Sequence, residues 1–279
     1  MAVLPPSHVL LCAALLLALR VCVVSGRPVH PRRPFFVYNP NNTDLIEGDI
    51  IPPKQKKQRF TTYTVVHDRA LTWPDGVVFY KYETDTETDT DMLFDEDTKE
   101  VINEAIHLIQ NKTCIRFEAH TDQENYVSIA YRQGRCASNV GMQGGEQTVA
   151  LDPSLCMGLG QVAHEFLHAL GFFHEHSRPD RDEYVDVVWN NIVEAANESF
   201  WLKSETEADT LGEPYDYESV MHYPHNAFSK PGVGSTLLPK VPEVQPETLG
   251  KAYRENFLTD TDIKKLNVLY TCGKEFVEA

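Results

Sequence analysis

The sequence contains few basic residues relative to its acidic ones. Over 279 residues it has 25 Lys and Arg against 41 Asp and Glu, which gives a formal net charge of -16. Proteins that hold nucleic acid or anionic lipid generally do so with a basic surface. We therefore expect neither a nucleic acid nor a membrane among the partners of this chain.

Long apolar runs are also scarce. The clearest one, Val9 to Leu19, is too short to cross a bilayer, and small residues follow it at Val24 and Gly26. We interpret residues 1–26 as a secretory signal peptide, with a signal anchor as the alternative. Because no second long apolar run occurs in the sequence, we expect a secreted, extracellular and soluble protein.

Cysteine is rare, and no C-x-x-C pair occurs, which weighs against a cysteine-ligated metal site. Two of the six cysteines fall within the signal peptide. An even number of cysteines in a secreted chain predicts two disulfides, and three pairings are open. The four remaining cysteines are Cys114, Cys136, Cys156 and Cys272.

Residues 27–59 lack an apolar pattern and contain six prolines. They end in a basic run, Lys54 to Arg59, which is a plausible site for a trypsin-like or furin-like protease. We interpret this region as a pro-segment, with a solvated linker as the alternative. The acidic stretch from Glu83 to Asp97 is read as a solvated loop rather than a calcium site, because it lacks the spacing of a calcium loop.

Hydrophobic periodicity places strands before the middle of the chain and mostly irregular structure after it. The expected strands are 77–82, 114–118, 126–131 and 147–151; the expected helices are 97–110, 159–170 and 259–270, with a short one within 183–195. This order predicts an α+β protein with two lobes and a site in the cleft between them.

The most specific feature is a pattern of three histidines and a glutamate. His164 and His168 are four residues apart, so a helix places both on one face, where they can bind one metal ion. Glu165 lies beside that ion and can take a proton from a water. Gly171 allows a sharp exit from the helix, which returns His174 as a third ligand. Three nitrogens with one open position indicate a catalytic zinc site, one Zn²⁺ per chain, rather than a helix with core histidines.

A methionine turn lies further along the chain, in Ser219-Val220-Met221-His222-Tyr223. A zinc motif followed by such a turn is the metzincin signature. Within the metzincins the chain resembles the astacin family of zinc metalloendopeptidases. The resemblance covers about residues 60–272 and is carried by Glu175, the run His176 to Asp182, the turn Ser219 to Tyr223, and Trp73 to Val78.

The resemblance implies a metzincin-type catalytic domain. Its first lobe would hold a five-stranded mixed sheet with two helices, and its second lobe would be irregular with one terminal helix. The implied organisation is signal peptide 1–26, pro-segment 27–59, catalytic domain 60–272 and a short tail 273–279. The implied disulfides are Cys114–Cys272 and Cys136–Cys156.

The resemblance also implies a role for each matching residue. These roles are zinc ligation for His164, His168 and His174, general-base catalysis for Glu165, oxyanion stabilisation for Tyr223, the floor of the site for Met221, and pairing with the new N-terminus for Glu175. In the pro-segment, Glu47-Gly48-Asp49 resembles the inhibitory motif of the family. Asp49 would then bind the zinc ion in the latent form, at the position that water needs.

Two departures concern activation. In astacins, the cleavage that produces the mature N-terminus usually lies about nine residues before the tryptophan of their Trp-Pro-x-Gly run. In this chain that region reads Tyr63-Thr64-Val65, without a basic residue just before it. Cleavage after Arg59 would instead leave Phe60 as a longer N-terminus. No cysteine lies in the pro-segment, which argues against a thiol switch.

We therefore expect a secreted endopeptidase made as a latent precursor, which hydrolyses peptide bonds with a zinc-activated water and Glu165. The alternative is a catalytically silent secreted zinc-binding module. The expected partners are protein or peptide substrates and an activating trypsin-like protease, with the enzyme itself a monomer. Three sequons predict N-glycosylation at Asn41, Asn111 and Asn197.

Overall fold

The computed structural model describes residues 44–53, 71–83, 94–204 and 209–273. The signal peptide, the basic run before Phe60, the sequon at Asn41 and most of the acidic stretch lie outside these ranges. The interpretations of those regions therefore stay predictions. In the described ranges, none of the helices has the length and apolar character that a bilayer-spanning helix requires.

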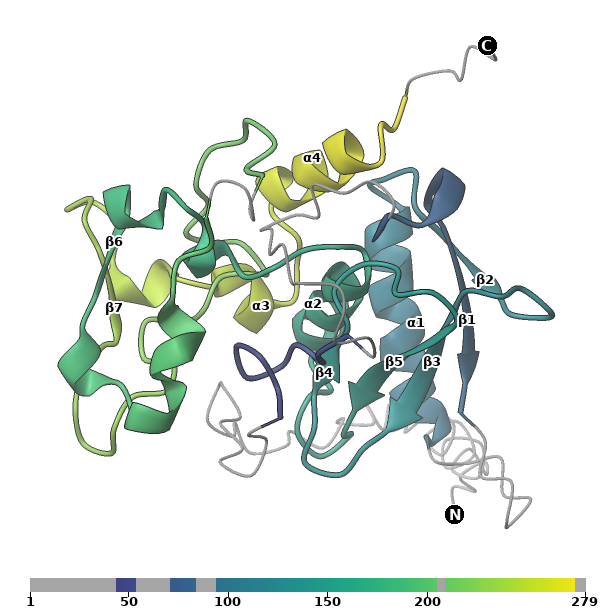
Figure 1. Cartoon of the computed structure of the whole chain (residues 1–279), viewed down its shortest axis with the longest axis horizontal. Coiled ribbons are helices and arrows are strands. Elements are labelled where there is room, and N and C mark those ends of the chain that lie inside the picture. Colours follow the sequence, from purple (N-terminus) through teal and green to yellow (C-terminus); the bar gives the residue numbers. More distant parts are fainter. Residues whose placement is uncertain (1–43, 54–70, 84–93, 205–208, 274–279) are drawn as a thin grey trace, which may run out of the picture. The chain divides into compact units, whose positions relative to one another are not determined.

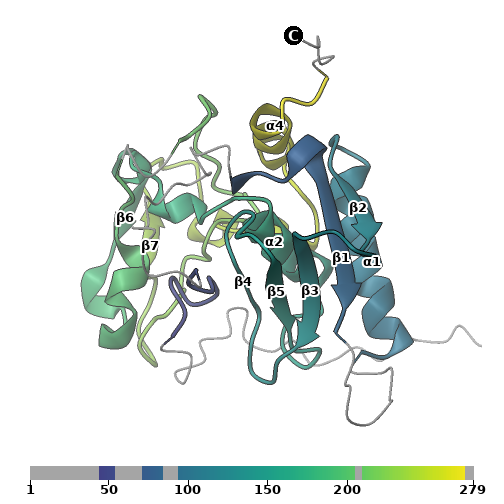
Figure 2. The ribbon, with the colours of Figure 1, turned by 45° about the vertical axis from the view of Figure 1, so that its right-hand side comes forward.

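A five-stranded sheet forms the core of the N-terminal lobe (Figures 1 and 2). Its spatial order is β2 (Arg116–Ala119), β1 (Val77–Tyr82), β3 (Tyr126–Tyr131), β5 (Glu146–Leu151) and β4 (Ala137–Ser138). The first four strands are parallel and β4 is antiparallel to β5. The sheet is therefore mixed, as expected, although the two-residue strand β4 was not predicted.

Two helices pack against this sheet and against each other, α1 (Glu96–Gln110) and α2 (Leu159–Ala169). In α1, Ile102, Ile106 and Ile109 recur on one face and are buried. Asp95 caps the helix by accepting a hydrogen bond from the Thr98 amide at 2.8 Å. In α2 the side chains from Val162 to Ala169 are all buried, so the helix is enclosed and can carry a site inside the protein.

The chain after α2 forms a second lobe with its own buried cluster, which includes Val185, Phe200, Tyr223 and Leu237. Its regular structure is a two-stranded antiparallel pair of β6 (Val185–Val187) and β7 (Leu237–Pro239). The later helices α3 (Lys251–Glu255) and α4 (Asp260–Leu269) bury Ala252, Leu266 and Leu269 in the core of the first lobe. The α+β class is confirmed, but two details differ. Residues 183–195 form 3₁₀ turns around β6 instead of a short α-helix, and α3 adds a helix before the terminal one.

Both disulfides join the pairs that the resemblance implies. Cys114 before β2 is bonded to Cys272 after α4, and Cys136 is bonded to Cys156. Thr259 caps α4, because its side chain accepts a hydrogen bond from the Asp262 amide at 2.9 Å. The Cys114–Cys272 disulfide therefore joins the residues after α4 to the segment before β2.

Residues 44–53 lie against β4 (purple in Figure 1). The Ser138 amide donates to the Asp49 carbonyl at 2.9 Å, and the Ile51 amide donates to the Ser138 carbonyl at 2.8 Å. The segment therefore adds backbone pairing to the edge of the sheet. Ile46 and Ile50 exchange two backbone hydrogen bonds of 2.9 Å, which closes the intervening Glu47-Gly48-Asp49 into a tight loop.

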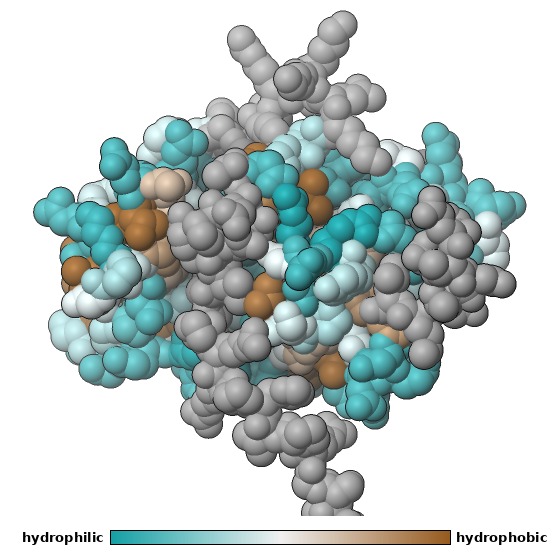
Figure 3. Space-filling view, turned by 90° about the horizontal axis from the view of Figure 1, so that it is seen from below, coloured by the Kyte–Doolittle hydropathy of each residue, from teal (hydrophilic) through white to brown (hydrophobic). Residues whose placement is uncertain are grey.

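Figure 3 shows the molecule from below. On the described part of this face, hydrophilic residues predominate and hydrophobic ones form small separate patches. Scattered exposed apolar side chains are ordinary on a protein surface. This face therefore offers no broad apolar area on its described part.

Candidate active site

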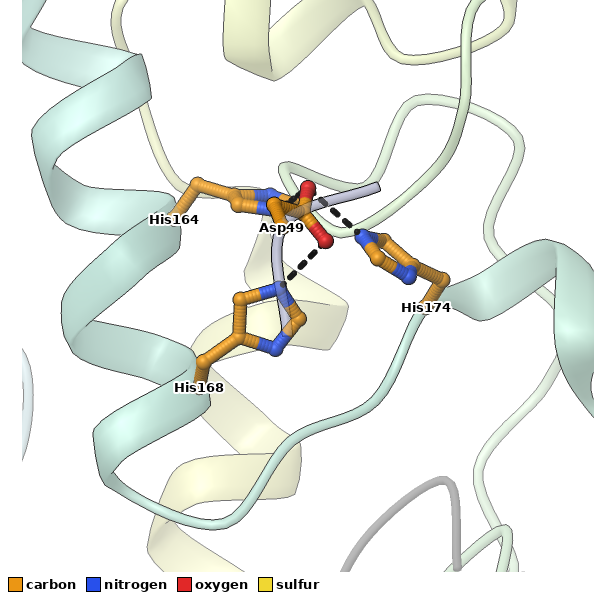
Figure 4. A group of neighbouring side chains, drawn as sticks. All are labelled: Asp49, His164, His168 and His174. Carbon is orange, nitrogen blue, oxygen red and sulfur yellow. Dashed lines mark hydrogen bonds and ion pairs between the residues drawn. The ribbon is translucent and has the colours of Figure 1, made fainter. Parts of the chain in front are cut away.

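Four buried side chains converge at the C-terminal half of α2: Asp49, His164, His168 and His174 (Figure 4). One potential ligand atom from each lies within 4.8 Å of the others. His164 and His168 are one helical turn apart on one face of α2. Gly171, with a φ of 106°, ends the helical path and turns the chain so that His174 faces the other two histidines.

Asp49 lies among the three imidazoles. Its Oδ2 is 3.2 Å from His174 Nε2 and 3.4 Å from His164 Nε2, and its Oδ1 is 3.7 Å from His168 Nε2. These three nitrogens and one carboxylate approach a common point. Such a donor set is typical of a four-coordinate zinc site.

The hydrogen bonds of the first two histidines fit metal binding. His164 Nδ1 is 2.8 Å from the Val220 carbonyl oxygen, and His168 Nδ1 is 2.7 Å from that of Phe172. A carbonyl can only accept, so each Nδ1 donates and each Nε2 presents a lone pair. Both Nε2 atoms are buried and have no hydrogen-bond partner among the described residues. Zn²⁺ satisfies such buried lone pairs, so the residues fit this metal.

The third histidine depends on the segment that carries Asp49. His174 Nδ1 is 2.7 Å from Glu47 Oε2. The Glu47 carboxylate also forms an ion pair with Lys203, and the Tyr223 hydroxyl donates to the Glu47 backbone carbonyl. Burial alone would raise the pKa of Glu47, but Lys203 and His174 outweigh burial and lower the pKa to about 2. Glu47 is therefore an anion held by two groups that lie far from it in the sequence.

Glu165, next to His164, is 2 % exposed. Its Oε2 is buried and has no hydrogen-bond partner in the described ranges. Burial, and then the nearby charge of Asp49, raise the pKa of Glu165 well above its ordinary value. A buried carboxylate with a high proton affinity beside a metal site is suited to accept a proton.

Met221 is buried in the tight turn after Ser219. Its backbone is bonded on both sides, because the Met221 amide donates to Ser219 Oγ at 3.0 Å and the Met221 carbonyl accepts from the Glu175 amide at 2.9 Å. The turn is thus bonded directly to the residue that follows His174. The apolar side chain of Met221 belongs to the core of the first lobe.

Glu175 has two cationic partners within the described chain. Its carboxylate contacts Lys265 Nζ at 2.6 and 2.7 Å and Arg178 at 3.0 Å, and it accepts the Asp216 amide at 3.0 Å. Burial by itself raises the pKa of Glu175, but the charges of Lys265 and Arg178 keep it below the ordinary value. Pairing of Glu175 with a new N-terminus stays a prediction, and it would add a third cation to this carboxylate.

Sequence reasoning missed several residues at this site: Glu47 as an individual contact, Lys203, Lys265 and Asp262. None belongs to a local pattern, because each contacts a residue more than 40 positions away in the sequence. For the glycosylation sequons, Asn111 is exposed after α1, whereas the Oδ1 of Asn197 is enclosed without a hydrogen bond to any described group.

A stability test arises from Asp216, beside Glu175. Burial, and then the charge of Asp262, raise the pKa of Asp216 to about 6 from an ordinary value of 3.8. A carboxyl with a raised folded pKa is protonated in both states below its unfolded pKa and then has no effect on stability. The cost grows as the pH rises from the unfolded to the folded pKa and is fully present above the folded pKa. We expect Asp216→Asn to raise the free energy of unfolding by about 1–3 kcal/mol at pH 8, with the gain disappearing below about pH 4.

Chemical denaturation of both proteins from about pH 3.5 to about pH 8 measures this difference. Asp122→Asn is the matched control, because Asp122 is an exposed carboxylate. An equal stability difference at both ends of the pH range would contradict the assignment of the cost to ionised Asp216.

Comparisons with known proteins agree with this geometry. A model of the Astacin peptidase family matches residues 65–271. The chain is 41% identical over 204 residues to zinc metalloproteinase nas-14 of Caenorhabditis elegans, covering 72% of this chain and 38% of that one. It is 34% identical over 241 residues to the low choriolytic enzyme of Oryzias latipes, covering 85% and 82%.

Among solved structures, the chain is similar to high choriolytic enzyme 1, a hatching enzyme zinc-protease of Oryzias latipes. The TM-score is 0.62 at 30% sequence identity, and the match covers 79% of this chain and all of that one. The family model spans the zinc motif, the Met-turn and both disulfides apart from Cys272. This chain therefore belongs to the astacin family of zinc metalloendopeptidases.

Proposed function

We propose that the chain is a secreted endopeptidase made as a latent precursor, which acts as a monomer on protein or peptide substrates. Residues 1–26 are its signal peptide, 27–59 its pro-segment, 60–272 its catalytic domain and 273–279 a short tail. The observation that carries the proposal is the position of Asp49 among His164, His168 and His174. A carboxylate there competes with substrate for the metal.

In the catalytic cycle each residue has one task. His164, His168 and His174 would hold Zn²⁺, which would supply Lewis-acid polarisation of the scissile carbonyl. Glu165 accepts a proton from the attacking water and passes it to the leaving amine. The Tyr223 hydroxyl, which donates to the Glu47 carbonyl in the precursor, donates to the substrate oxyanion once Glu47 has left.

Activation requires removal of the segment that contains Glu47 and Asp49. A trypsin-like protease cutting in the basic run before Phe60 would separate this segment from the catalytic domain. After the cut, the segment is still held by its pairing with Ser138 and by the contacts of Glu47. Release of a non-covalent segment is favoured at low protein concentration and by further proteolysis of the segment.

The test uses the secreted precursor. Trypsin treatment should generate casein cleavage that a zinc chelator abolishes, and sequencing of the new N-terminus identifies the cut. Cleavage of casein by the untreated precursor at the same rate would refute latency. Absence of cleavage after processing, with one zinc bound per chain, would refute the peptidase assignment.

A second test concerns Gly48, which lies between the two carboxylates. Its φ is +85°, and a Cβ at this position would lie 2.7 Å from the ring of Phe228. We expect Gly48→Ala to strain the loop and weaken the latent state, so that the unprocessed precursor gains measurable activity towards casein. Gly144→Ala is the control: its φ of +82° imposes similar backbone strain, but a Cβ there meets nothing within 4 Å among the described residues. Equal basal activities of the two variants would contradict this prediction.

A further inference from the structure

The last helix holds the Met-turn through a buried carboxylate. Asp262, in the first turn of α4, is 2 % exposed. Its Oδ1 accepts a hydrogen bond from Ser219 Oγ at 2.6 Å, and its Oδ2 accepts one from the Val220 amide at 3.0 Å. Two consecutive residues of the turn are thus bonded to one side chain that lies more than 40 positions later in the sequence.

The same carboxylate is fixed by its own helix. Asp262 Oδ2 also accepts the Thr259 amide at 3.0 Å, and the Asp262 amide donates to Thr259 Oγ1 at 2.9 Å. These reciprocal bonds are a capping box, and its bond from the Thr259 backbone amide directs the Asp262 carboxylate towards the turn. The carboxylate is therefore a rigid acceptor and not a flexible surface group.

The residue whose amide is bonded to Asp262 is also the one whose carbonyl accepts from a candidate zinc ligand. Val220 donates its amide to Asp262, and its carbonyl accepts from His164 Nδ1 at 2.8 Å. Ser219 Oγ, which donates to Asp262, also accepts the Met221 amide at 3.0 Å. Val220 is thereby bonded to Asp262 on one side and to the imidazole of His164 on the other.

We propose that Asp262 is a positioning residue for zinc: it fixes the Val220 carbonyl, which sets the tautomer and ring orientation of His164. The inference rests on the proposed zinc site. Groups that orient a ligating histidine commonly change metal affinity by about 10–100-fold when they are removed. His168 and His174 have other acceptors, the Phe172 carbonyl and Glu47, so Asp262 acts on His164 selectively.

The test measures zinc affinity and folding separately on the full-length precursor. Competition with a chelator gives the zinc dissociation constant, and denaturation of the metal-free protein gives the free energy of unfolding. We expect Asp262→Ala to raise the dissociation constant by about 10–100-fold. Asp262→Asn, whose amide oxygen can still accept the Val220 amide, should rescue most of this loss and leave an increase of about fivefold.

Thr259→Ala is the matched control. It removes only the Oγ1 half of the capping box, and the Asp262 carboxylate keeps its bonds to the backbone amide of residue 259, to Ser219 and to Val220. We expect it to lower the free energy of unfolding while the zinc dissociation constant stays within about twofold of the wild type. A loss of zinc affinity in this variant equal to that of Asp262→Ala would show that Asp262 serves α4 alone, and would overturn the inference.

Two further results would decide the matter. Should Asp262→Ala fail to fold, Asp262→Asn and Ser219→Ala carry the test, each with an expected increase of about fivefold in the dissociation constant. Values within about twofold of the wild type in both variants overturn the inference. If the wild type itself binds no zinc, the proposed function fails; if it binds zinc and the variants match it, only the role of Asp262 fails.

Discussion

Glu165→Gln should reduce kcat of the processed enzyme by about 10²–10⁴-fold, the usual contribution of a general base. The side chain is buried beside His164, and its Oε2 has no hydrogen-bond partner among the described residues, so it is available to a water. Glutamine has the same shape but cannot accept the proton. The zinc content should stay at one per chain, because Glu165 is not one of the four clustered ligands.

Steady-state hydrolysis of a fluorogenic peptide, together with metal analysis, measures this effect. Glu124→Gln provides the control, because it makes the same chemical change at an exposed position. Turnover by Glu165→Gln at a rate comparable to that of Glu124→Gln would exclude Glu165 as the base. Loss of zinc in Glu165→Gln would instead assign it a structural role.

The second large effect should come from Asp49→Asn, which is expected to make the unprocessed precursor active. The neutral amide is a poor ligand for Zn²⁺, so it competes less well than the Asp49 carboxylate for the metal position among the three histidines. A loss of about 1.4 kcal/mol in this competition corresponds to a factor of ten, so we expect casein cleavage by the intact precursor to rise by about tenfold or more. Glu47→Gln should have a smaller effect in the same direction, since it weakens the pairing with Lys203 and His174.

Asp44→Asn separates this effect from a general weakening of the pro-segment. Asp44 pairs with Arg135 at 2.8 Å on the surface, and exposed pairs of this kind contribute little. The unprocessed Asp44→Asn precursor should cleave casein as slowly as the unprocessed wild type. N-terminal sequencing before each assay confirms that the precursor is intact, and an inactive, intact Asp49→Asn precursor with zinc bound would contradict the assignment of latency to Asp49.

Much of the first lobe could be predicted because its signals are local. The run of β-branched and aromatic residues in Val77–Tyr82 and the apolar face of α1 each lie within one element, and both expected ranges agree with the observed bounds within one residue. The spacing of His164, His168 and His174 likewise fixes three ligands within one helix and the turn after it. The role of Asp49 came from the resemblance, since nothing in the residues around it specifies a metal.

The second lobe was less predictable because its elements are short and are selected by tertiary contacts. Strand β7 has three residues and ends in Pro239, and α3 has five residues between two residues with positive φ, Gly250 and Asn256. Neither is long enough to show a period. The contacts of Lys203, Lys265 and Asp262 could not be predicted for a related reason. Their partners are distant in the sequence and become neighbours only when the protein has folded.

The hydrogen bonds around the candidate active site join residues far apart in the chain: Tyr223 to Glu47 spans 176 positions, His174 to Glu47 spans 127, and Lys265 to Glu175 spans 90. Closing loops of this length is slow, and contacts of high sequence separation form late in folding. During synthesis, the three histidines emerge from the ribosome about ninety residues before Asp262, which is bonded to Val220, and Lys265, which is bonded to Glu175. A chain truncated before α4 would therefore contain the complete zinc motif but would lack the contacts of Asp262 to Val220 and of Lys265 to Glu175.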